Sequence, residues 1–251
     1  RIFEAELFKN HIPFKIIGGT GFYDREEIKD AIAVLKLLCN PLDKVNFRRI
    51  INKPSRGLGE KTIERILVEG NDDTISALSN YILNAKRGKT KVGAESFISA
   101  YNEATKELDA GLALSKVVSN ALEYFGIIDY YRKEKDELLR SDKLDNLREF
   151  VGTFEDCGPG RDELMNYLEN KALDTKTREE NADGRPCVTL ITMHNTKGLE
   201  FDYVFVTGLE DELIPGPRSS QSAKGIEEER RIFYVAVTRA RKELYLSFTV
   251  R

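Results

Sequence analysis

Apolar residues recur at helical spacing through the middle of the chain. In residues 25–38, "REEIKDAIAVLKLL", isoleucines and leucines fall on one stripe, and the Asn-Pro pair that follows ends the pattern. Similar patterns predict further helices at residues 60–68, 74–85, 93–106, 112–125, 141–155 and 161–173. The charged stretch at 174–186 predicts a linker that leaves this helical region.

The two ends of the chain show strand patterns instead. "PFKII" (13–17) follows a short helical pattern, and "VTLITM" (188–193) and "YVFVTGL" (203–209) are apolar and rich in β-branched residues. Their continuous apolarity is typical of strands that are covered on both faces. A helical pattern at 227–240 and an alternating strand at 243–248 follow.

Strands that alternate with helices indicate an α/β layer. We therefore predict an α/β domain formed by residues 1–22 and 186–251, interrupted by a large all-α insertion at 23–185. The glycines of "GGTG" (18–21) allow unusual backbone angles at this junction, as a hinge requires. A Gly-rich turn without motion would have the same sequence.

Composition narrows the class of protein. The 251 residues are 41% hydrophobic and 32% charged, with a net charge of -3, so contacts with nucleic acid must come from local patches. No apolar run approaches roughly 18 residues, so no membrane partner is expected. Three widely spaced cysteines predict neither a zinc cluster nor a disulfide framework and are typical of a reducing cytoplasm. The missing start Met predicts an excised fragment.

The stretch "TMHNTKGLEF" (192–201) follows an apolar strand and is therefore expected at a sheet edge, where open α/β sheets bind ligands. Its Lys-Gly step lacks the other residues of a Walker loop. Gly198 lets a phosphate approach the backbone, and Glu200 can accept a hydrogen bond from a ribose hydroxyl. An ordinary loop between strands, with a surface histidine, is the alternative.

Arg239 stands near the end of the helix predicted at 227–240. A helix-terminal arginine commonly binds the last carbonyls of its own helix. Arg241 lies just beyond it and is expected on the surface.

The stretch "KPSRGLGEKT" (53–62) combines glycines with a helix start. Gly57 and Gly59 flank Leu58, which is expected to pack inward, and a helix is predicted from about Glu60. Such a loop lets backbone N–H groups face a phosphate at a helix N-terminus. A plain loop between helices is the alternative.

Basic residues surround this loop and outnumber the two acidic residues, which predicts a local patch on an acidic protein. They are Lys44, Arg48, Arg49, Lys53, Arg56, Lys61 and Arg65. A second basic run, "AKRGKTK" (85–91), is compatible with DNA contact but is more typical of a solvated loop.

Four stretches together resemble UvrD/PcrA/Rep-type superfamily 1 DNA helicases. They are "IPFKIIGGTGFYDREEIKDAIAVLKLLCNP", "RIINKPSRGLGEKTIERI", "VTLITMHNTKGLEFDYVFVTGLED" and "EEERRIFYVAVTRARKELYLSF". They cover roughly half the chain in that family's order and spacing and are similar to its second motor domain, called 2A, with the helical insertion called 2B. Gly216 departs from the pattern, because the family commonly has a histidine there, so no site is assigned to it.

The resemblance implies a RecA-like parallel-sheet domain of a motor that moves 3′ to 5′ on single-stranded DNA and unwinds duplex DNA, in repair or replication. ATP with Mg²⁺ would lie in a cleft, bound mainly by an N-terminal motor domain that is missing here. The isolated chain is therefore expected to be inactive. By resemblance, Arg239 is a catalytic arginine finger and Glu200 contacts the ribose.

The resemblance also implies DNA contacts. Thr192 and His194 would touch single-stranded DNA. The glycine loop would hold duplex DNA through the residues that match its motif, with the Arg56 and Lys61 side chains exposed. These residues are Ser55, Arg56, Gly57, Gly59 and Lys61.

Two other readings remain open from the sequence. One is a stand-alone module that binds duplex DNA without sequence preference and has no motor. The other is the helicase subunit of a helicase–nuclease. A Walker loop before Arg1 would exclude the first, and a nuclease domain after Arg251 would favour the second.

Overall fold

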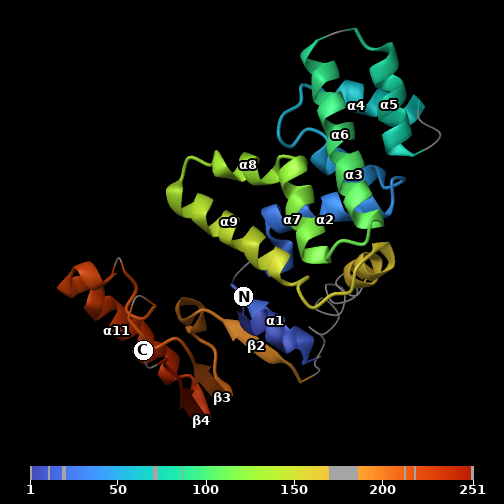
Figure 1. The fold of residues 1–251 in the computed structure, drawn as a ribbon. Coiled ribbons are helices and arrows are strands. Elements are labelled where there is room, and N and C mark those ends of the chain that lie inside the picture. The colour runs from blue at the N-terminus through green and yellow to red at the C-terminus, as the bar shows by residue number, and fades with distance from the viewer. Residues whose placement is uncertain are drawn as a thin grey trace. The chain divides into compact units, whose positions relative to one another are not determined.

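The computed structural model describes residues 2–10, 12–18, 21–69, 73–86, 88–169, 186–211, 213–217 and 219–249. The chain forms two compact units (Figure 1). One unit consists of Arg1–Thr20 together with Glu180–Arg251, and the other is Gly21–Glu179. The linker predicted from 174 and the second and third residues of "GGTG" lie outside the described residues, apart from residue 186.

The second unit is helical. Its described elements are η1 (Phe22–Asp24), α2 (Glu26–Cys39), α3 (Lys44–Ile50), α4 (Glu60–Glu69), α5 (Thr74–Asn84), α6 (Lys89–Asp109), α7 (Leu114–Tyr124), α8 (Ile127–Arg132) and α9 (Glu137–Gly152), with a further helix at 161–169. The helices predicted from periodicity are confirmed where the structure describes them, with ends that differ by a few residues, and residues 170–173 of the last predicted helix lie outside the described residues. The predictions missed α3 and α8, which are 7 and 6 residues long and too short to show a clear period.

Helix α2 lies at the centre of this unit and packs against α3, α6, α7, α8 and α9. Ile28, Leu35 and Leu38 of the predicted stripe are fully buried, and so are Ala33 and Leu37 on other sides of the helix. Most sides of α2 are therefore buried, and Glu26 and Lys29 are the charged residues that it leaves exposed. Close by, three phenylalanines pack edge to face: Phe47 of α3, Phe97 of α6 and Phe125, which follows α7.

A buried carboxylate interrupts the apolar surface of α2. Asp30 has no exposed surface, and its oxygens accept hydrogen bonds from Arg49 Nε at 2.7 Å, from Lys53 Nζ at 2.6 Å and from the Tyr131 hydroxyl. Buried charges are tolerated when they are paired and hydrogen-bonded in this way. Asp30 therefore ties together α2, α3, α8 and the segment that follows α3.

The first unit is a mixed α/β structure with short parallel strands. Strand β1 (Phe14–Ile17) pairs with β2 (Val188–Ile191), with Phe14 opposite Val188, and β3 (Phe201–Val206) pairs with β4 (Ala240–Leu246). The other described elements are α1 (Ile2–Lys9), η2 (Met193–Thr196), η3 (Ser219–Gln221) and α11 (Ala223–Val237). Parallel strands need a long crossover, and α11 lies in the one that joins β3 to β4 (Figure 1).

The expectation that the strand at 203–209 is covered on both faces is wrong for β3. Tyr203 and Phe205 are 54% and 68% exposed, and most of β4 is exposed as well. The pair consists of two strands, and α11 is the described helix that packs against it. Among the described residues, no helix combines the length and apolar character needed to cross a membrane.

Candidate nucleotide and DNA sites

The residues after β2 form a short turn that is held against the end of β1. In η2, Asn195 Nδ2 donates to Thr192 Oγ1 at 2.9 Å and to the Gly18 carbonyl at 3.2 Å. Gly18 has φ +75°, and a Cβ there would collide with the Asn195 side chain. The carboxyl ends of two parallel strands thus meet, with Thr192 and His194 exposed beside them.

Gly198 and Arg239 are brought to a second place in the same unit, where β3 and β4 begin. Gly198 has φ +83°, and no atom lies within 4 Å of the place where a Cβ would stand. Glu200 is exposed just before β3. The Phe201 N–H donates to the Arg239 carbonyl at 2.9 Å, so the two chain segments are neighbours.

The Arg239 side chain is folded back onto backbone. Its Nε donates to the Val235 carbonyl at 2.9 Å, and its Nη1 donates to the Leu199 carbonyl at 3.4 Å. This is the arrangement of a helix-terminal arginine that binds its own last carbonyls. The hydrogen bond to the Leu199 carbonyl nevertheless brings the guanidinium to the residue that immediately precedes Glu200. Arg241, as expected, is exposed and pairs with Asp202.

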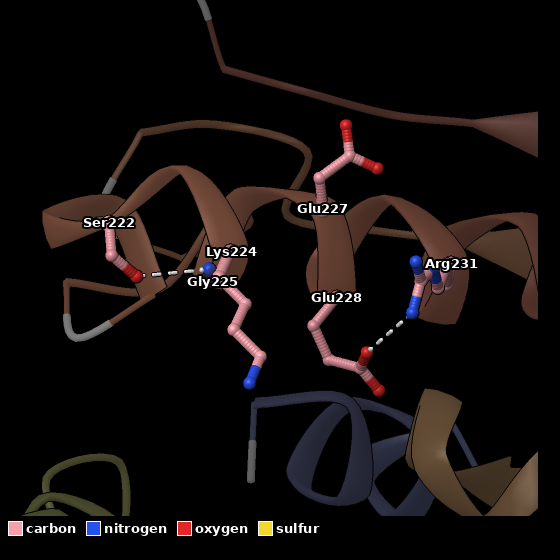
Figure 2. A pocket seen from close by; sticks show the side chains of 6 residues that line it. All are labelled: Ser222, Lys224, Gly225, Glu227, Glu228 and Arg231. Carbon is pink, nitrogen blue, oxygen red and sulfur yellow. Dashed lines mark hydrogen bonds and ion pairs between the residues drawn. The ribbon is translucent and has the colours of Figure 1, made fainter.

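An open hollow of about 520 Å³ lies along the first half of α11. Figure 2 shows Lys224, Glu228 and Arg231 on one side of the helix, with the Glu228–Arg231 ion pair at 3.6 Å and Ser222 capping the helix through the Gly225 N–H. None of Gly198, Glu200 and Arg239 lines the hollow, so it is separate from the predicted nucleotide residues, and its lining is a charged helix face.

In the helical unit, the glycine loop presents a row of backbone donors at the start of α4. Leu58 is fully buried, which confirms its predicted role as an anchor. Gly57 has φ +75°, and Gly59 has open space where a Cβ would stand. Consecutive residues at this turn have backbone N–H groups that donate to no acceptor in the described part of the chain. These residues are Gly57, Leu58, Gly59, Glu60 and Lys61.

The prediction that the Arg56 side chain is exposed is wrong. It is 7% exposed, and its guanidinium lies 5.1 Å from the centre of the Phe97 ring. Its Nη2 donates to the Phe125 carbonyl at 2.6 Å, and its Nη1 donates to several carbonyls of the preceding turn. Burial lowers the pKa of Arg56 to about 10, which leaves it charged at neutral pH. A guanidinium that is enclosed by carbonyls cannot reach a phosphate in this conformation.

The predicted basic patch is also smaller than its sequence suggests. Arg49 and Lys53 bind Asp30, and Arg48 lies 3.3 Å from Glu60. Burial lowers the pKa of Lys53, but hydrogen bonds to Asp30 and Glu26 outweigh it and raise that pKa above its ordinary value. Internal pairs therefore neutralise much of the patch.

Lys61 remains exposed, and no carboxylate in the described part of the chain pairs with it. The structure also places a lysine beside the glycine loop whose segment, 85–91, was predicted to be a solvated loop. Lys89, in the first turn of α6, is exposed, and its Cγ lies 3.8 Å from the position that a Cβ on Gly57 would take. Thr90 Oγ1 donates to the Gly57 carbonyl at 3.2 Å. The basic run at 85–91 thus borders the glycine loop, a neighbourhood that only the folded chain reveals.

No group of three or more His, Cys, Asp or Glu side chains in the described ranges is arranged to hold a metal ion.

Comparison with known proteins identifies the chain's relatives. The profile of the UvrD-like helicase C-terminal domain matches residues 1–251. The chain belongs to this family.

Individual relatives of this UvrD-like C-terminal domain are whole helicases. The chain is 36% identical over 256 residues to the ATP-dependent DNA helicase PcrA of Staphylococcus epidermidis, covering 98% of this chain and 35% of that protein. It is 34% identical over 266 residues to PcrA of Bacillus subtilis and 36% identical over 274 residues to the ATP-dependent DNA helicase UvrD1 of Mycobacterium bovis. Each match covers 98% of this chain and 34% of the relative, so the chain spans about a third of the length of these relatives.

Proposed function

We propose that this UvrD-like domain is the second motor domain, with its helical insertion, of an ATP-dependent DNA helicase. The motor would move 3′ to 5′ and unwind duplex DNA in repair or replication. Residues 1–22 and 186–251 are assigned to the motor domain, and residues 23–185 are assigned to the insertion. Family membership and the names of the relatives support this function, and the glycine loop supports a DNA-binding role for the insertion.

Gly198, Glu200 and Arg239 are proposed to line one side of an ATP site whose other side is an N-terminal motor domain. Gly198 fits this role because its backbone is open to an approaching phosphate, and Glu200 fits because its carboxylate is exposed. Bound ATP with Mg²⁺ would supply the phosphoryl transfer that drives the motor, and the metal would be held mainly by that first domain. Arg239 would have to exchange its carbonyl partners for the nucleotide's charge.

Residues 1–251 alone are therefore expected to bind ATP weakly and to hydrolyse none. The chain offers few donors to a triphosphate, because one open glycine and one arginine cannot replace a complete phosphate loop. Titration calorimetry of the isolated chain with ATP tests this expectation. Micromolar affinity would contradict the proposed division of the site between two domains.

Thr192 and His194 are proposed to contact single-stranded DNA. Both are exposed where β1 and β2 end, and the Asn195 hydrogen bonds hold this turn in place. Hydroxyl and imidazole groups can bind phosphate oxygens without reading the bases.

The observation that carries the duplex-binding proposal is the donor row at the start of α4. Unbonded N–H groups at a helix N-terminus attract anions, and Gly59 leaves space for a phosphate to approach them. Two exposed lysines belong to or border the row, Lys61 at its end on α4 and Lys89 of α6 beside Gly57. Ser55, Gly57, Gly59 and Lys61 are thus proposed to bind duplex phosphates.

Fluorescence anisotropy with a labelled duplex over a salt series tests this site. A few phosphate contacts should give a non-specific Kd of about 10⁻⁴–10⁻⁶ M at physiological salt. Lys61→Ala should reduce the log–log salt slope by about 0.9 whatever the duplex sequence, because one phosphate contact is lost.

Lys116→Ala is the matched control. Lys116 is exposed on α7, nine residues before Phe125, which places it about 13 Å along that helix from the Arg56 contact. Lys116→Ala removes one positive charge, as Lys61→Ala does, and it should leave the log–log salt slope of duplex binding unchanged. Equal effects of the two substitutions would mean that only net charge matters, and the loop would then have no part in binding.

A further inference from the structure

Arg56 connects three segments that are far apart in the sequence. Its guanidinium Nη1 donates to the Ile50 and Ile51 carbonyls at 3.0 and 3.1 Å, at the end of α3. Its Nη2 donates to the carbonyl of Phe125, 69 residues away, just after α7. The same group lies over the Phe97 ring of α6. No carboxylate among the described residues pairs with it, so its partners are backbone carbonyls and a ring.

The backbone of Arg56 is held as firmly as its side chain. Its N–H donates to Asn52 Oδ1 at 2.6 Å. On the opposite side Gly93 of α6 comes so close that a Cβ there would lie 2.8 Å from the Arg56 Cβ and nearer still to its carbonyl oxygen. One residue on, the Gly57 carbonyl accepts from Thr90 Oγ1. The carbonyl side of the turn is therefore bound inward, and the donors that begin at Gly57 are left without partners.

An arginine suits this position for a geometric reason. The guanidinium is a rigid planar fork with five N–H donors, so one group can bind carbonyls from separate segments at once. A lysine carries the same charge on a flexible stem and offers three donors from a single nitrogen. It could bind the carbonyls of the α3 end or that of Phe125, but it could not bridge them with the same geometry.

We propose that Arg56 is a positioning residue. It fixes the glycine loop at 55–59 in the form that presents its N–H groups to phosphates, and it does so from inside the protein without touching DNA. The phosphate-binding step rests on the duplex-binding function proposed above. The ordering of the loop is a property of the free protein.

Limited trypsin digestion of residues 1–251 tests the ordering without any DNA. Trypsin cleaves after arginine and after lysine, so Arg56→Lys keeps the cleavage site and the net charge. The wild-type bond after residue 56 should resist cleavage, because its side chain is buried. Arg56→Lys should be cut there at least about tenfold faster, since cleavage follows the population of the opened loop.

Two further variants frame this result. Arg148→Lys is the matched control, because Arg148 is exposed on α9 and pairs only with Asp145 in the described structure, so the loop should be cut as in the wild type. Asn52→Ala removes an exposed side chain that holds the Arg56 N–H, so it should loosen the same loop to a smaller degree even if Arg56→Lys does not fold.

Duplex binding separates positioning from direct contact. At a temperature where circular dichroism shows each variant to be folded, Arg56→Lys should bind at least about fivefold more weakly, because a loose loop must be ordered on binding. Arg56→Gln removes the charge, and its salt slope should nevertheless stay within about 0.3 of the wild type, since no phosphate contact is lost, whereas Lys61→Ala should reduce the slope by about 0.9.

Three results would overturn the proposal. They are unchanged trypsin resistance in both Arg56→Lys and Asn52→Ala, a salt slope that falls in Arg56→Gln as it does in Lys61→Ala, and a lowered melting temperature with unchanged duplex affinity in Arg56→Lys. The last would show a merely structural arginine. If the wild-type chain does not bind duplex DNA, the proposed function fails, and the trypsin comparison still decides whether Arg56 orders the loop.

Discussion

Gly93 lies in the second turn of α6, where the helix touches the backbone of the glycine loop. We predict that Gly93→Ala destabilises the helical unit, although alanine normally stabilises a helix. In a helix interior, alanine gains about 0.5–1 kcal/mol over glycine. Here the added Cβ would lie 2.9 Å from the Arg56 carbonyl carbon and closer to its oxygen. These are backbone atoms, which cannot turn away as a flexible side chain does.

The size of the effect follows from these two opposing contributions. Inserting a methyl group into a packed site costs about 1–3 kcal/mol, which exceeds the gain in helix propensity and leaves a net loss of about 1–2 kcal/mol. For a unit of this length, that loss lowers the melting temperature by about 2–8 °C. Duplex affinity should fall as well, because the loop that carries the donors must shift.

Thermal unfolding followed by circular dichroism measures the change, with Gly152→Ala as the matched control. Gly152 is the last residue of α9, and no atom lies within 4 Å of its missing Cβ, so its substitution should be neutral or stabilising by up to about 1 kcal/mol. If Gly93→Ala melts as high as Gly152→Ala, the close contact is absent in solution and the loop does not rest on α6.

Other substitutions test the remaining assignments. In a chain that includes the first motor domain, Arg239→Ala should lower ATP turnover by at least about 10²-fold and leave nucleotide binding within about tenfold, because the group acts on transition-state charge; unchanged turnover would exclude the finger. Glu200→Ala should weaken nucleotide binding by about 1–3 kcal/mol, measured by calorimetry, through the lost ribose acceptor. Asp30→Ala should lower the free energy of unfolding in urea by about 2–4 kcal/mol, because Lys53 and the partly exposed Arg49 lose a buried partner; a loss below about 0.5 kcal/mol would show that the pair is not formed.

Local patterns in the sequence determined much of the secondary structure. Apolar periodicity located the long helices, because a helix that packs on a core must repeat its apolar side every three to four residues. The same pattern underestimated how much of α2 is buried, because this helix is buried on nearly all sides. The glycine loop and the inward Leu58 were also predictable, since a Gly-apolar-Gly turn before a helix start is a property of neighbouring residues.

Pairing between distant residues was decided by the tertiary structure alone. The sequence around the glycine loop shows a run of cations, but Asp30 lies 19 residues before Arg49 and 101 residues before Tyr131, and only folding brings them together. Arg56 was predicted to be an exposed cation, but its acceptors are backbone carbonyls, one of them 69 residues away. Every residue has a backbone carbonyl, so no residue type in the sequence marks these acceptors. Periodicity reports which side of an element faces the core. Whether a charged side chain pairs with another group of the protein or stays exposed for a ligand depends on which segments meet, and the fold decides that.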